Sequence, residues 1–293
     1  MTLQLVVGYD GSPEAGAAIN VGAALFPAAH AFITYLWLPP FASDKVRRRL
    51  RAQARDITEL IALIEQEGES EAGRIIATGV TLANAAGWQA ESLLQRTWGG
   101  EGWRIAQAAE EVDADLVVVG SRGLGGTQAL LGSVSDLVVH YSSRPTVVVP
   151  HPLLSTEHAA LSSGPVIVGW DGSTGSEMAL AAAAALFVGR DLLLVSVGDE
   201  DGPSADGDEL HGHRVLRVKT TRDHGFRGRT TAHALIAAAR EIDAAAVVVG
   251  SRGRSLARDI VLGSVAMATL HHTERPVMVV PAEWSSPAPS ENR

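Results

Sequence analysis

The 293-residue chain contains no cysteine and no long apolar run. The lack of cysteine excludes disulfides, thiolate catalysis and zinc–thiolate sites. The longest uninterrupted apolar run, from Met178 to Val188, has 11 residues, whereas a membrane-spanning helix needs about 20. No basic segment precedes an apolar stretch at the N-terminus, so no secretory signal is expected and the expected location is the cytoplasm.

Positive charge is also scarce, because 24 Lys and Arg stand against 33 Asp and Glu, a net charge of −9. Nucleic acids and anionic membranes both require a basic surface, so neither is expected as a partner. The composition, 46% hydrophobic with 30 Gly and 13 Pro, is that of a globular protein rather than a disordered or collagen-like one. At roughly 100–200 residues per domain, the length predicts two domains.

The chain repeats itself in three blocks that occur in the same order in each half. The matched pairs are LVVGYDGS at 5–12 with VIVGWDGS at 166–173, ADLVVVGSRG at 114–123 with AAAVVVGSRG at 244–253, and RPTVVVP at 144–150 with RPVMVVP at 275–281. Such self-similarity indicates a duplicated domain. The predicted division is a first domain at 1–150, a linker at 151–164, a shortened second domain at 165–283 and a disordered tail at 284–293.

Each copy alternates strand and helix patterns. Continuous apolar runs that end in turn residues are typical of buried parallel strands, and capped Ala-rich or charged segments are typical of helices. In the first copy the predicted strands are 3–9, 31–38, 88–97, 116–119 and 146–149, and the predicted helices are 13–26, 44–67, 102–112 and 133–141. The alternation predicts an α/β fold with a doubly wound parallel sheet. In the second copy an acidic, Gly-rich loop within 197–215 replaces the long helix.

A glycine-rich loop follows the fourth strand of each copy and resembles an anion site. The loop leaves the carboxyl end of a parallel strand, where open sheets bind ligands. Its glycines let backbone approach a phosphate, and the Gly-Ser pair that ends it opens a helix whose N–H groups attract negative charge. The alternative is that the glycines only make turns, with Ser133 and Ser264 as helix N-caps. Asp10 and Asp171 follow the first strand of each copy and are expected to face the same edge of the sheet as these glycines. The alternative is that each aspartate is the N-cap of the helix that follows it.

The order of these blocks resembles the universal stress protein family in tandem form. The resemblance covers nearly all of residues 3–282 and rests on strand–Asp-Gly-Ser, VVVGSRG, a Gly-Ser nine residues later and Arg-Pro-Val-x-Val-Val-Pro. It implies two Rossmann-like (adenine nucleotide α-hydrolase-like) domains, each with a five-stranded parallel sheet of order 3-2-1-4-5 and helices on both faces. The second copy matches the family's Gly-x2-Gly-x9-Gly-Ser pattern, and the first is one residue short.

The resemblance implies ATP binding, with Mg²⁺ on the phosphates. The first site would comprise Asp10 at the nucleoside, Leu36 offering backbone to the adenine, and Gly120, Arg122, Gly123, Gly132, Ser133, Val134 and Ser135 around the ribose and phosphates. The second would comprise Asp171, Val197, Gly250, Arg252, Gly253, Gly263, Ser264, Val265 and Ala266. Ala266 would deprive the second site of the phosphate donor that Ser135 supplies.

The predicted function is an ATP-binding stress-response regulator that acts on an unidentified protein partner. No catalytic residues or protein metal site are expected, and hydrolysis should be slow because no spacing singles out a general base. His211 and His213 have a metal-like spacing, but a solvated loop is the preferred interpretation. An ATP-hydrolysing or nucleotidyl-transfer enzyme and a non-binding structural module remain alternatives. The fifth strands, 146–149 and 277–280, are expected to pair within the chain as a pseudo-dimer, and a homodimer is left open.

Overall fold

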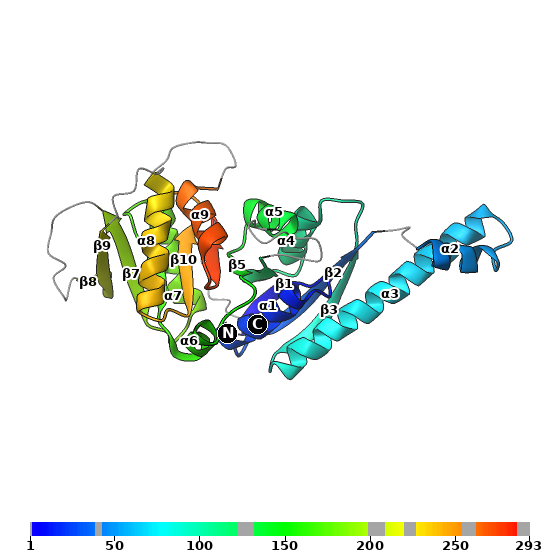
Figure 1. The fold of residues 1–293 in the computed structure, drawn as a ribbon, viewed down its shortest axis with the longest axis horizontal. Coiled ribbons are helices and arrows are strands. Elements are labelled where there is room, and N and C mark those ends of the chain that lie inside the picture. The colour runs from blue at the N-terminus through cyan, green and yellow to red at the C-terminus, as the bar shows by residue number, and fades with distance from the viewer. Residues whose placement is uncertain are drawn as a thin grey trace.

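The chain folds into two α/β halves joined through one sheet (Figure 1). The computed structural model describes residues 2–38, 43–121, 132–198, 209–219, 227–253 and 262–285. The first half contains β1 (Gln4–Gly8), α1 (Pro13–Leu25), β2 (His30–Trp37), α2 (Asp44–Arg51), α3 (Ile57–Ala85), β3 (Gln89–Arg96), α4 (Glu101–Glu111), β4 (Leu116–Gly120), α5 (Ser133–Tyr141) and β5 (Thr146–Val149). After α6 (Ser155–Ser163), the second half contains β6 (Val166–Gly169), α7 (Thr174–Leu186), β7 (Leu192–Gly198), β8 (Glu209–Leu210), β9 (His213–Lys219), α8 (Arg227–Glu241), β10 (Ala246–Gly250), α9 (Ser264–His272) and β11 (Val277–Val280).

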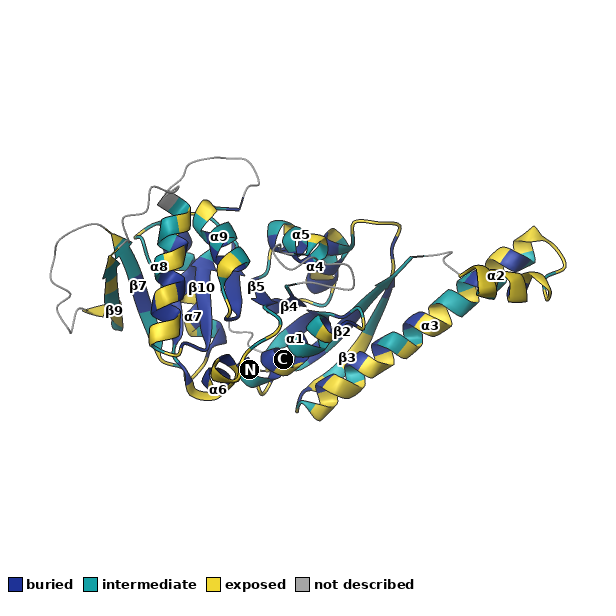
Figure 2. Cartoon of the chain, viewed as in Figure 1, coloured by how far each residue is buried: buried dark blue, intermediate teal, exposed yellow. Residues whose placement is uncertain are grey.

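Within the described residues the strands form one 11-stranded sheet of order β3-β2-β1-β4-β5-β11-β10-β6-β7-β9-β8. The central strands are runs of Val, Leu and Ile that are buried on both faces (Figure 2), as the continuous apolar pattern predicts. Each half keeps the predicted order 3-2-1-4-5, since β9, β7, β6, β10 and β11 repeat β3, β2, β1, β4 and β5. The α/β fold is therefore confirmed. The prediction of five parallel strands is wrong for the second half, where the short β8 adds a sixth strand that pairs antiparallel with β9.

The two halves meet where β5 pairs antiparallel with β11. Met278 lies opposite Val147 and Val277 opposite Val148, and all four side chains are buried. One apolar core on each face of the sheet contains residues from both halves. The predicted pairing of the fifth strands is thus present within the chain, and it removes both strands from the sheet edges.

Helices cover both faces of the sheet. One core includes Leu5 and Val7 of β1 with residues of α1, α3 and α7, and the other includes Val6 with residues of α4, α5, α8 and α9. Alternate residues of one strand therefore face opposite helix layers, as the two-residue period of a strand requires. Among the described residues, no helix is both long and apolar enough to cross a membrane.

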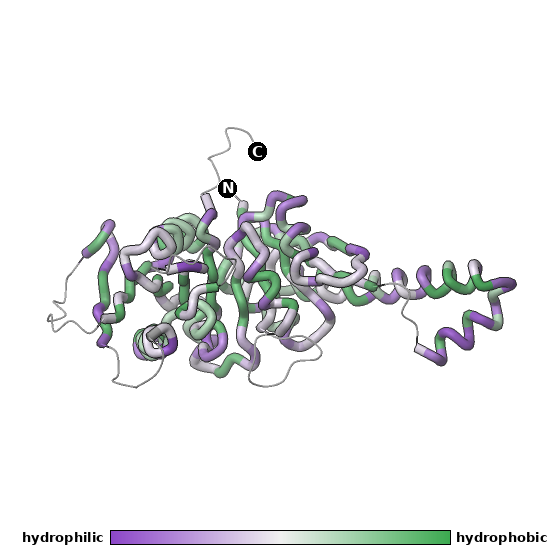
Figure 3. Tube along the Cα trace, turned by 90° about the horizontal axis from the view of Figure 1, so that it is seen from above, coloured by the Kyte–Doolittle hydropathy of each residue, from purple (hydrophilic) through white to green (hydrophobic). Residues whose placement is uncertain are grey.

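The prediction of a single helix over 44–67 is wrong. The chain instead forms a hairpin of α2 and α3 that projects from the end of the sheet (Figures 1 and 3). Asp56 begins α3 by accepting a hydrogen bond from the Glu59 backbone N–H at 2.8 Å, and the Glu59 carboxylate accepts one from the Arg55 N–H. These two bonds form a variant of the capping box, in which the Glu59 carboxylate bonds the residue before the N-cap, and they start a new helix. Leu50, Leu60 and Ile64 then pack between the two arms.

The second half has no helix between β7 and β9 in its described residues, and 199–208 of the predicted acidic loop lie outside them. In the first half, α3 packs so closely on the sheet that a Cβ on Gly79 would lie 2.7 Å from the Tyr9 ring. In the second half Trp170 follows β6 as Tyr9 follows β1. The ring of His211 packs edge-on against it, with centroids 5.6 Å apart.

The predicted linker at 151–164 contains helix α6, and the predicted disordered tail begins with an ordered residue. The interpretation from Ser and Pro content missed α6, which packs against α1. Trp284 is buried in the core that also contains residues of α1 and α7, so the prediction of a disordered tail at 284–293 is wrong for Trp284. Residues 286–293 lie outside the described part of the chain.

Arg190, in the second half, contacts the first half near the C-terminal ends of α1 and α6. Its guanidinium donates hydrogen bonds to the carbonyls of Ala24 at 3.2 Å, Leu161 at 2.6 Å and Gly164 at 3.3 Å. These carbonyls lie at the ends of α1 and α6, where helix dipoles favour a cation. Burial lowers the pKa of Arg190, but a guanidinium remains charged at neutral pH.

Replacing Arg190 with alanine should therefore lower the free energy of unfolding by about 1–3 kcal/mol, because three carbonyls lose a charged donor. Chemical denaturation measures the change. Arg74→Ala is the control, since Arg74 forms an exposed ion pair with Glu71 at 2.7 Å and its loss should cost less than about 1 kcal/mol. Equal effects of the two substitutions would contradict the role of Arg190.

Candidate functional site

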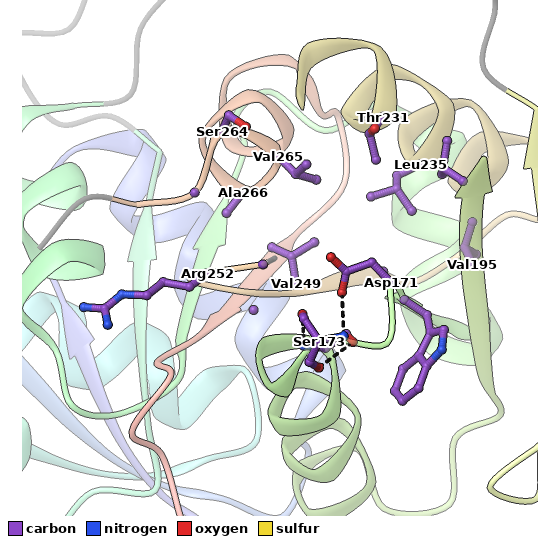
Figure 4. Close-up of a pocket in the computed structure, with 17 residues that line it drawn as sticks. Asp171, Ser173, Val195, Thr231, Leu235, Val249, Arg252, Ser264, Val265 and Ala266 are labelled. Carbon is purple, nitrogen blue, oxygen red and sulfur yellow. Dashed lines mark hydrogen bonds between the residues drawn. The ribbon is translucent and has the colours of Figure 1, made fainter. Parts of the chain in front are cut away.

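A pocket opens at the carboxyl ends of β6, β7 and β10, beside α8 and α9 (Figure 4). Its cavity volume is about 200 Å³, somewhat below the roughly 300–1,000 Å³ of typical small-molecule sites. The lining residues are Gly169, Trp170, Asp171, Ser173, Ser176, Val195, Val197, Thr231, Leu235, Val249, Gly250, Arg252, Gly253, Gly263, Ser264, Val265 and Ala266. The structure thus brings together all nine residues predicted for the second site, and their role in binding stays a prediction.

Asp171 stands in the turn between β6 and α7. Its Oδ1 accepts a hydrogen bond from the Ser173 N–H at 3.0 Å, as Asp10 accepts one from the Ser12 N–H at 2.9 Å. The helix N-caps are Ser12 and Ser173, so the alternative that the aspartates cap these helices is wrong. A Cβ on Gly253 would lie 3.2 Å from Asp171 Oδ2, which places this carboxylate beside the glycine-rich loop.

The glycine-rich loop lies against the first turn of α7. A Cβ on Gly250 would clash with the carbonyl oxygen of Gly175, and a Cβ on Gly175 would clash with that of Arg252. Backbone therefore meets backbone at a distance that only glycine permits. This contact fixes the path of the loop from Gly250 to Gly253 along the floor of the pocket.

Helix α9 begins at the pocket without a side-chain cap on its first N–H groups. Its first internal bond runs from the Met267 N–H to the Gly263 carbonyl at 2.9 Å, so the three preceding N–H groups have no acceptor within the helix. Gly263 is the N-cap and no side chain caps this helix, so the interpretation of Ser264 as N-cap is wrong. An uncapped helix start with its positive dipole end in a pocket is suited to an anion.

The first half repeats this arrangement. Gly132 is the N-cap of α5, again without a side-chain cap, so Ser133 is not an N-cap either. Gly132 N–H donates to the Ser121 carbonyl at 2.7 Å, and Gly263 N–H donates to that of Ser251 at 2.8 Å. The one-residue shortening of the first loop therefore leaves the start of α5 in its place. Arg122 and Gly123 lie outside the described residues.

The remaining predicted residues of the first site hold the expected positions around this edge. Asp10 follows β1, Leu36 is near the end of β2, Gly120 ends β4, and Val134 follows Ser133 in α5. Burial, and then the charge of Asp10, raises the pKa of both Tyr9 and Tyr35 above the ordinary value for tyrosine. Both phenols are therefore neutral at pH 7, and Asp10 contributes negative potential at this edge of the sheet.

Ser135 does not supply the donor that the sequence predicts for the first site. Its hydroxyl is buried and donates to the carbonyl oxygen of Gly120 at 2.6 Å. The prediction that Ala266 deprives the second site of a phosphate donor is therefore wrong, because the proton of Ser135 is already bonded to the backbone. The hydroxyl fastens α5 to the end of β4.

Arg252 contributes backbone to the loop, while its side chain extends away from Asp171 and Val265 (Figure 4).

Sequence reasoning missed Thr231 and Leu235, which line the pocket from α8. The internal repeat could have identified Leu235, because Ile105 has the equivalent position in the first half. A Cβ on Gly8 would lie 3.3 Å from Ile105, as one on Gly169 would lie 3.3 Å from Leu235.

Comparison with known proteins places both halves in one family. The model of the universal stress protein family matches residues 1–150 and 163–281. A universal stress protein of Mycolicibacterium smegmatis is 36% identical over 186 residues, which are 57% of this chain and 62% of that relative's length. One from Mycobacterium tuberculosis is 28% identical over 98% of both chains. The crystal structure of a universal stress protein from Archaeoglobus fulgidus has the same fold, with a TM-score of 0.65, 21% identity and coverage of 95% of this chain and 98% of that one.

Proposed function

Because this chain belongs to the universal stress protein family, we propose that it is an ATP-binding regulatory protein of the stress-response type, with one nucleotide site in each half. The observation that carries the proposal is the pocket at the carboxyl ends of β6 and β10. Its glycine-rich backbone and uncapped helix start provide the groups that recognise a phosphate. Open parallel sheets bind ligands at this edge, beside the strand where the order reverses.

In the second site, the lining residues that the sequence predicts have proposed parts in holding the nucleotide. The N–H groups of Ser264, Val265 and Ala266 would receive the phosphates, together with the loop from Gly250 to Gly253. Asp171 would stand at the nucleoside end, and the backbone of Val197 at the end of β7 would meet the adenine. Bound Mg²⁺ would neutralise charge on the phosphates.

The same lining residues favour capture over catalysis. The ionisable side chains among them are Asp171 and Arg252. Asp171 would stand at the nucleoside end rather than beside the terminal phosphate, and the Arg252 side chain points away from the pocket, so neither has a proposed role in activating water. We therefore expect at most weak ATP hydrolysis or autophosphorylation, and we expect the bound state to act by changing the affinity for a protein partner.

Analysis of the nucleotide that purifies with the protein tests this function. The protein is denatured and removed, and the released ligand is identified by chromatography and mass spectrometry with its molar ratio to the chain. An adenine nucleotide is the expected result. An empty protein that also shows no thermal shift with Mg-ATP would favour a structural module, and turnover of Mg-ATP well above background would favour an enzyme.

Gly132→Val and Gly263→Val should each weaken ATP binding at one site by about 100-fold or more. A Cβ on Gly263 would lie 3.2 Å from the Ser251 carbonyl oxygen, and the two methyl groups of valine would occupy space beside the donors of α9. Isothermal titration calorimetry of each variant and of the double variant measures the loss. Unchanged affinity would contradict the assignment. The control is Gly73→Ala in α3, where a Cβ meets nothing within 4 Å.

A further inference from the structure

The tip of the α2–α3 hairpin differs in charge from the rest of the chain. The hairpin tip is defined as residues 44–64, which comprise α2, the turn after it and the first two turns of α3. It contains six Lys and Arg against three Asp and Glu, a net charge of +3, so the remaining residues carry −12 and the whole chain −9. All six basic side chains are exposed, namely Lys45, Arg47, Arg48, Arg49, Arg51 and Arg55.

Most of this positive charge has no carboxylate beside it. Arg49 pairs with Glu67 at 2.7 Å, and Arg47 lies 3.8 Å from Asp44. The other four basic side chains of the hairpin tip form no ion pair within the part of the chain that the structure describes. The two remaining carboxylates of the tip accept the backbone hydrogen bonds that start α3. The packing of the hairpin therefore leaves most of the basic side chains available to another molecule.

Two isoleucines of α3 leave apolar surface exposed at the hairpin tip. Ile57 is 66% exposed and Ile61 is 46% exposed. They are four residues apart, so they form one stripe along the surface of the helix. Apolar surface in water is unfavourable, and its burial against an apolar partner is a driving force for association.

Helical periodicity places this stripe beside arginines. The two isoleucines stand three residues before and one residue after Leu60, and Arg47 and Arg51 stand at the same offsets from Leu50. Leu50 and Leu60 pack against each other between two arms that run in opposite directions. In such a pair, equal offsets from the facing residues lie on the same side of the hairpin. One side of the hairpin tip therefore carries apolar and basic side chains together.

The hairpin tip projects beyond the body of the protein (Figures 1 and 3). At Gly68, α3 already lies against the sheet, since a Cβ there would be 3.3 Å from the Trp37 ring at the end of β2. At about 1.5 Å per residue, the helix from Ile57 to Glu67 extends roughly 16 Å further. Screening acts over about 8 Å at physiological ionic strength, so the negative charge of the body is largely screened at the tip.

We propose that the hairpin tip binds an anionic lipid surface, with its basic side chains at the headgroups and the two isoleucines in the apolar layer beneath them. An apolar stripe beside basic side chains is the pattern of a helix that lies in a membrane interface. Clusters of about four to eight Lys and Arg on such helices attract anionic lipids. The inference goes beyond the proposed function, because no nucleotide is required.

The arrangement of the arginines favours lipid over an acidic protein. Arg47, Arg48 and Arg49 are consecutive, so they point in three directions around α2. Charges spread in this way suit a surface of diffuse negative charge, whereas a folded protein presents carboxylates at fixed positions. The net charge of −9 predicts no anionic membrane as a partner only where charge is evenly distributed, and in this chain it is not.

Sedimentation of the full-length protein with lipid vesicles tests the proposal. With vesicles of equal parts phosphatidylcholine and phosphatidylglycerol, we expect at least about tenfold more bound protein than with pure phosphatidylcholine, and release in about 0.5 M NaCl. Arg48→Glu combined with Arg51→Glu changes the charge of the hairpin tip from +3 to −1 and should abolish binding. The matched control, Arg74→Glu with Arg240→Glu, makes the same change in net charge at exposed positions outside the tip and should bind as wild type.

A second measurement reports insertion and does not depend on the charge-reversal variants. Because the chain contains no cysteine, a single introduced cysteine can be labelled specifically. Ile57→Cys carrying a polarity-sensitive fluorophore should shift its emission to the blue on the anionic vesicles. Val188→Cys, at a position that is 81% exposed in the other half, should show no shift.

Three results would overturn the proposal. The first is wild-type protein that does not sediment with anionic vesicles at low salt. The second is equal binding by the charge-reversed tip and its control, because the attraction would then arise elsewhere on the molecule. The third is a protein that ignores the vesicles but is retained on immobilised polyglutamate through the same arginines, which would assign the hairpin tip to an acidic protein. None of these results bears on ATP binding, so the proposed function is tested separately.

Discussion

Gly175→Ala is expected to abolish ATP binding at the second site and to leave the first site intact. Gly175 is not a pocket-lining residue, yet a Cβ there would clash with the Arg252 carbonyl oxygen and lie 2.9 Å from its carbonyl carbon. Because both partners are backbone, the clash can be relieved only by separating the start of α7 from the loop at Gly250 to Gly253, which changes the path of the loop relative to the pocket. We expect a loss of about 100-fold or more, which corresponds to roughly 3 kcal/mol of binding free energy.

Calorimetric titration with Mg-ATP measures this as a fall from two binding sites per chain to one. The matched control is Gly16→Ala, near the start of the equivalent helix α1, where the nearest atom to a new Cβ is 4.0 Å away. That variant should keep both sites. Two unaltered sites in Gly175→Ala would show that the contact between the loop and α7 does not position the phosphate-binding backbone.

Met278→Ala should destabilise the whole chain, because Met278 fills the junction between the halves. It lies opposite Val147 across the antiparallel β5–β11 pair, and its side chain is fully buried. Truncation of a buried Met to Ala costs about 2–5 kcal/mol, from lost burial and from the cavity left behind. Since the cavity lies at the junction, we also expect the halves to unfold less cooperatively, so that two thermal transitions replace one.

Differential scanning calorimetry measures both effects. Met178→Ala is the control, because Met178 is only partly buried at the start of α7, and its loss should be smaller. A Met278→Ala protein with wild-type stability and a single transition would show that the junction contributes little to folding. Equal losses for the two variants would contradict the particular importance of the β5–β11 pair.

The sheet could be predicted from the sequence because its strands are buried on both faces. Runs such as Val117–Val119 and Val247–Val249 are continuous and apolar, and only a strand inside a helix-covered parallel sheet places such a run in the core. The duplication then assigned the same strand order to both halves. The antiparallel pairing of β5 with β11 could be expected because an apolar strand at a sheet edge requires cover.

The helical hairpin of α2 and α3 was harder to predict because its helices carry many charges and project from the core. A periodicity measured over Asp44 to Glu67 does not reveal where a helix stops. The signal that could have found the break is the capping pattern of Asp56 and Glu59. Helix α6 lacks even that signal, since Leu154 precedes it without a side-chain cap.

In the site, the position of the glycines was predictable but their contacts were not. The spacing of Gly250, Gly253 and Gly263 placed them around one pocket. The clash that excludes a side chain at Gly175 depends on how α7 packs against the loop, which is a tertiary contact between segments about 75 residues apart. The hydroxyl of Ser135 was misassigned for the same reason, because its acceptor, the Gly120 carbonyl, is brought near only by the packing of α5 on β4.

The central claim is that each half of this chain holds one adenine nucleotide at the carboxyl edge of its sheet. The most direct test is the number of ATP molecules that the ligand-free, full-length protein binds in the presence of Mg²⁺, measured by equilibrium dialysis with labelled ATP. The proposed function predicts close to two per chain, with one lost in Gly132→Val and the other in Gly263→Val. A chain that binds no ATP under these conditions would contradict the claim.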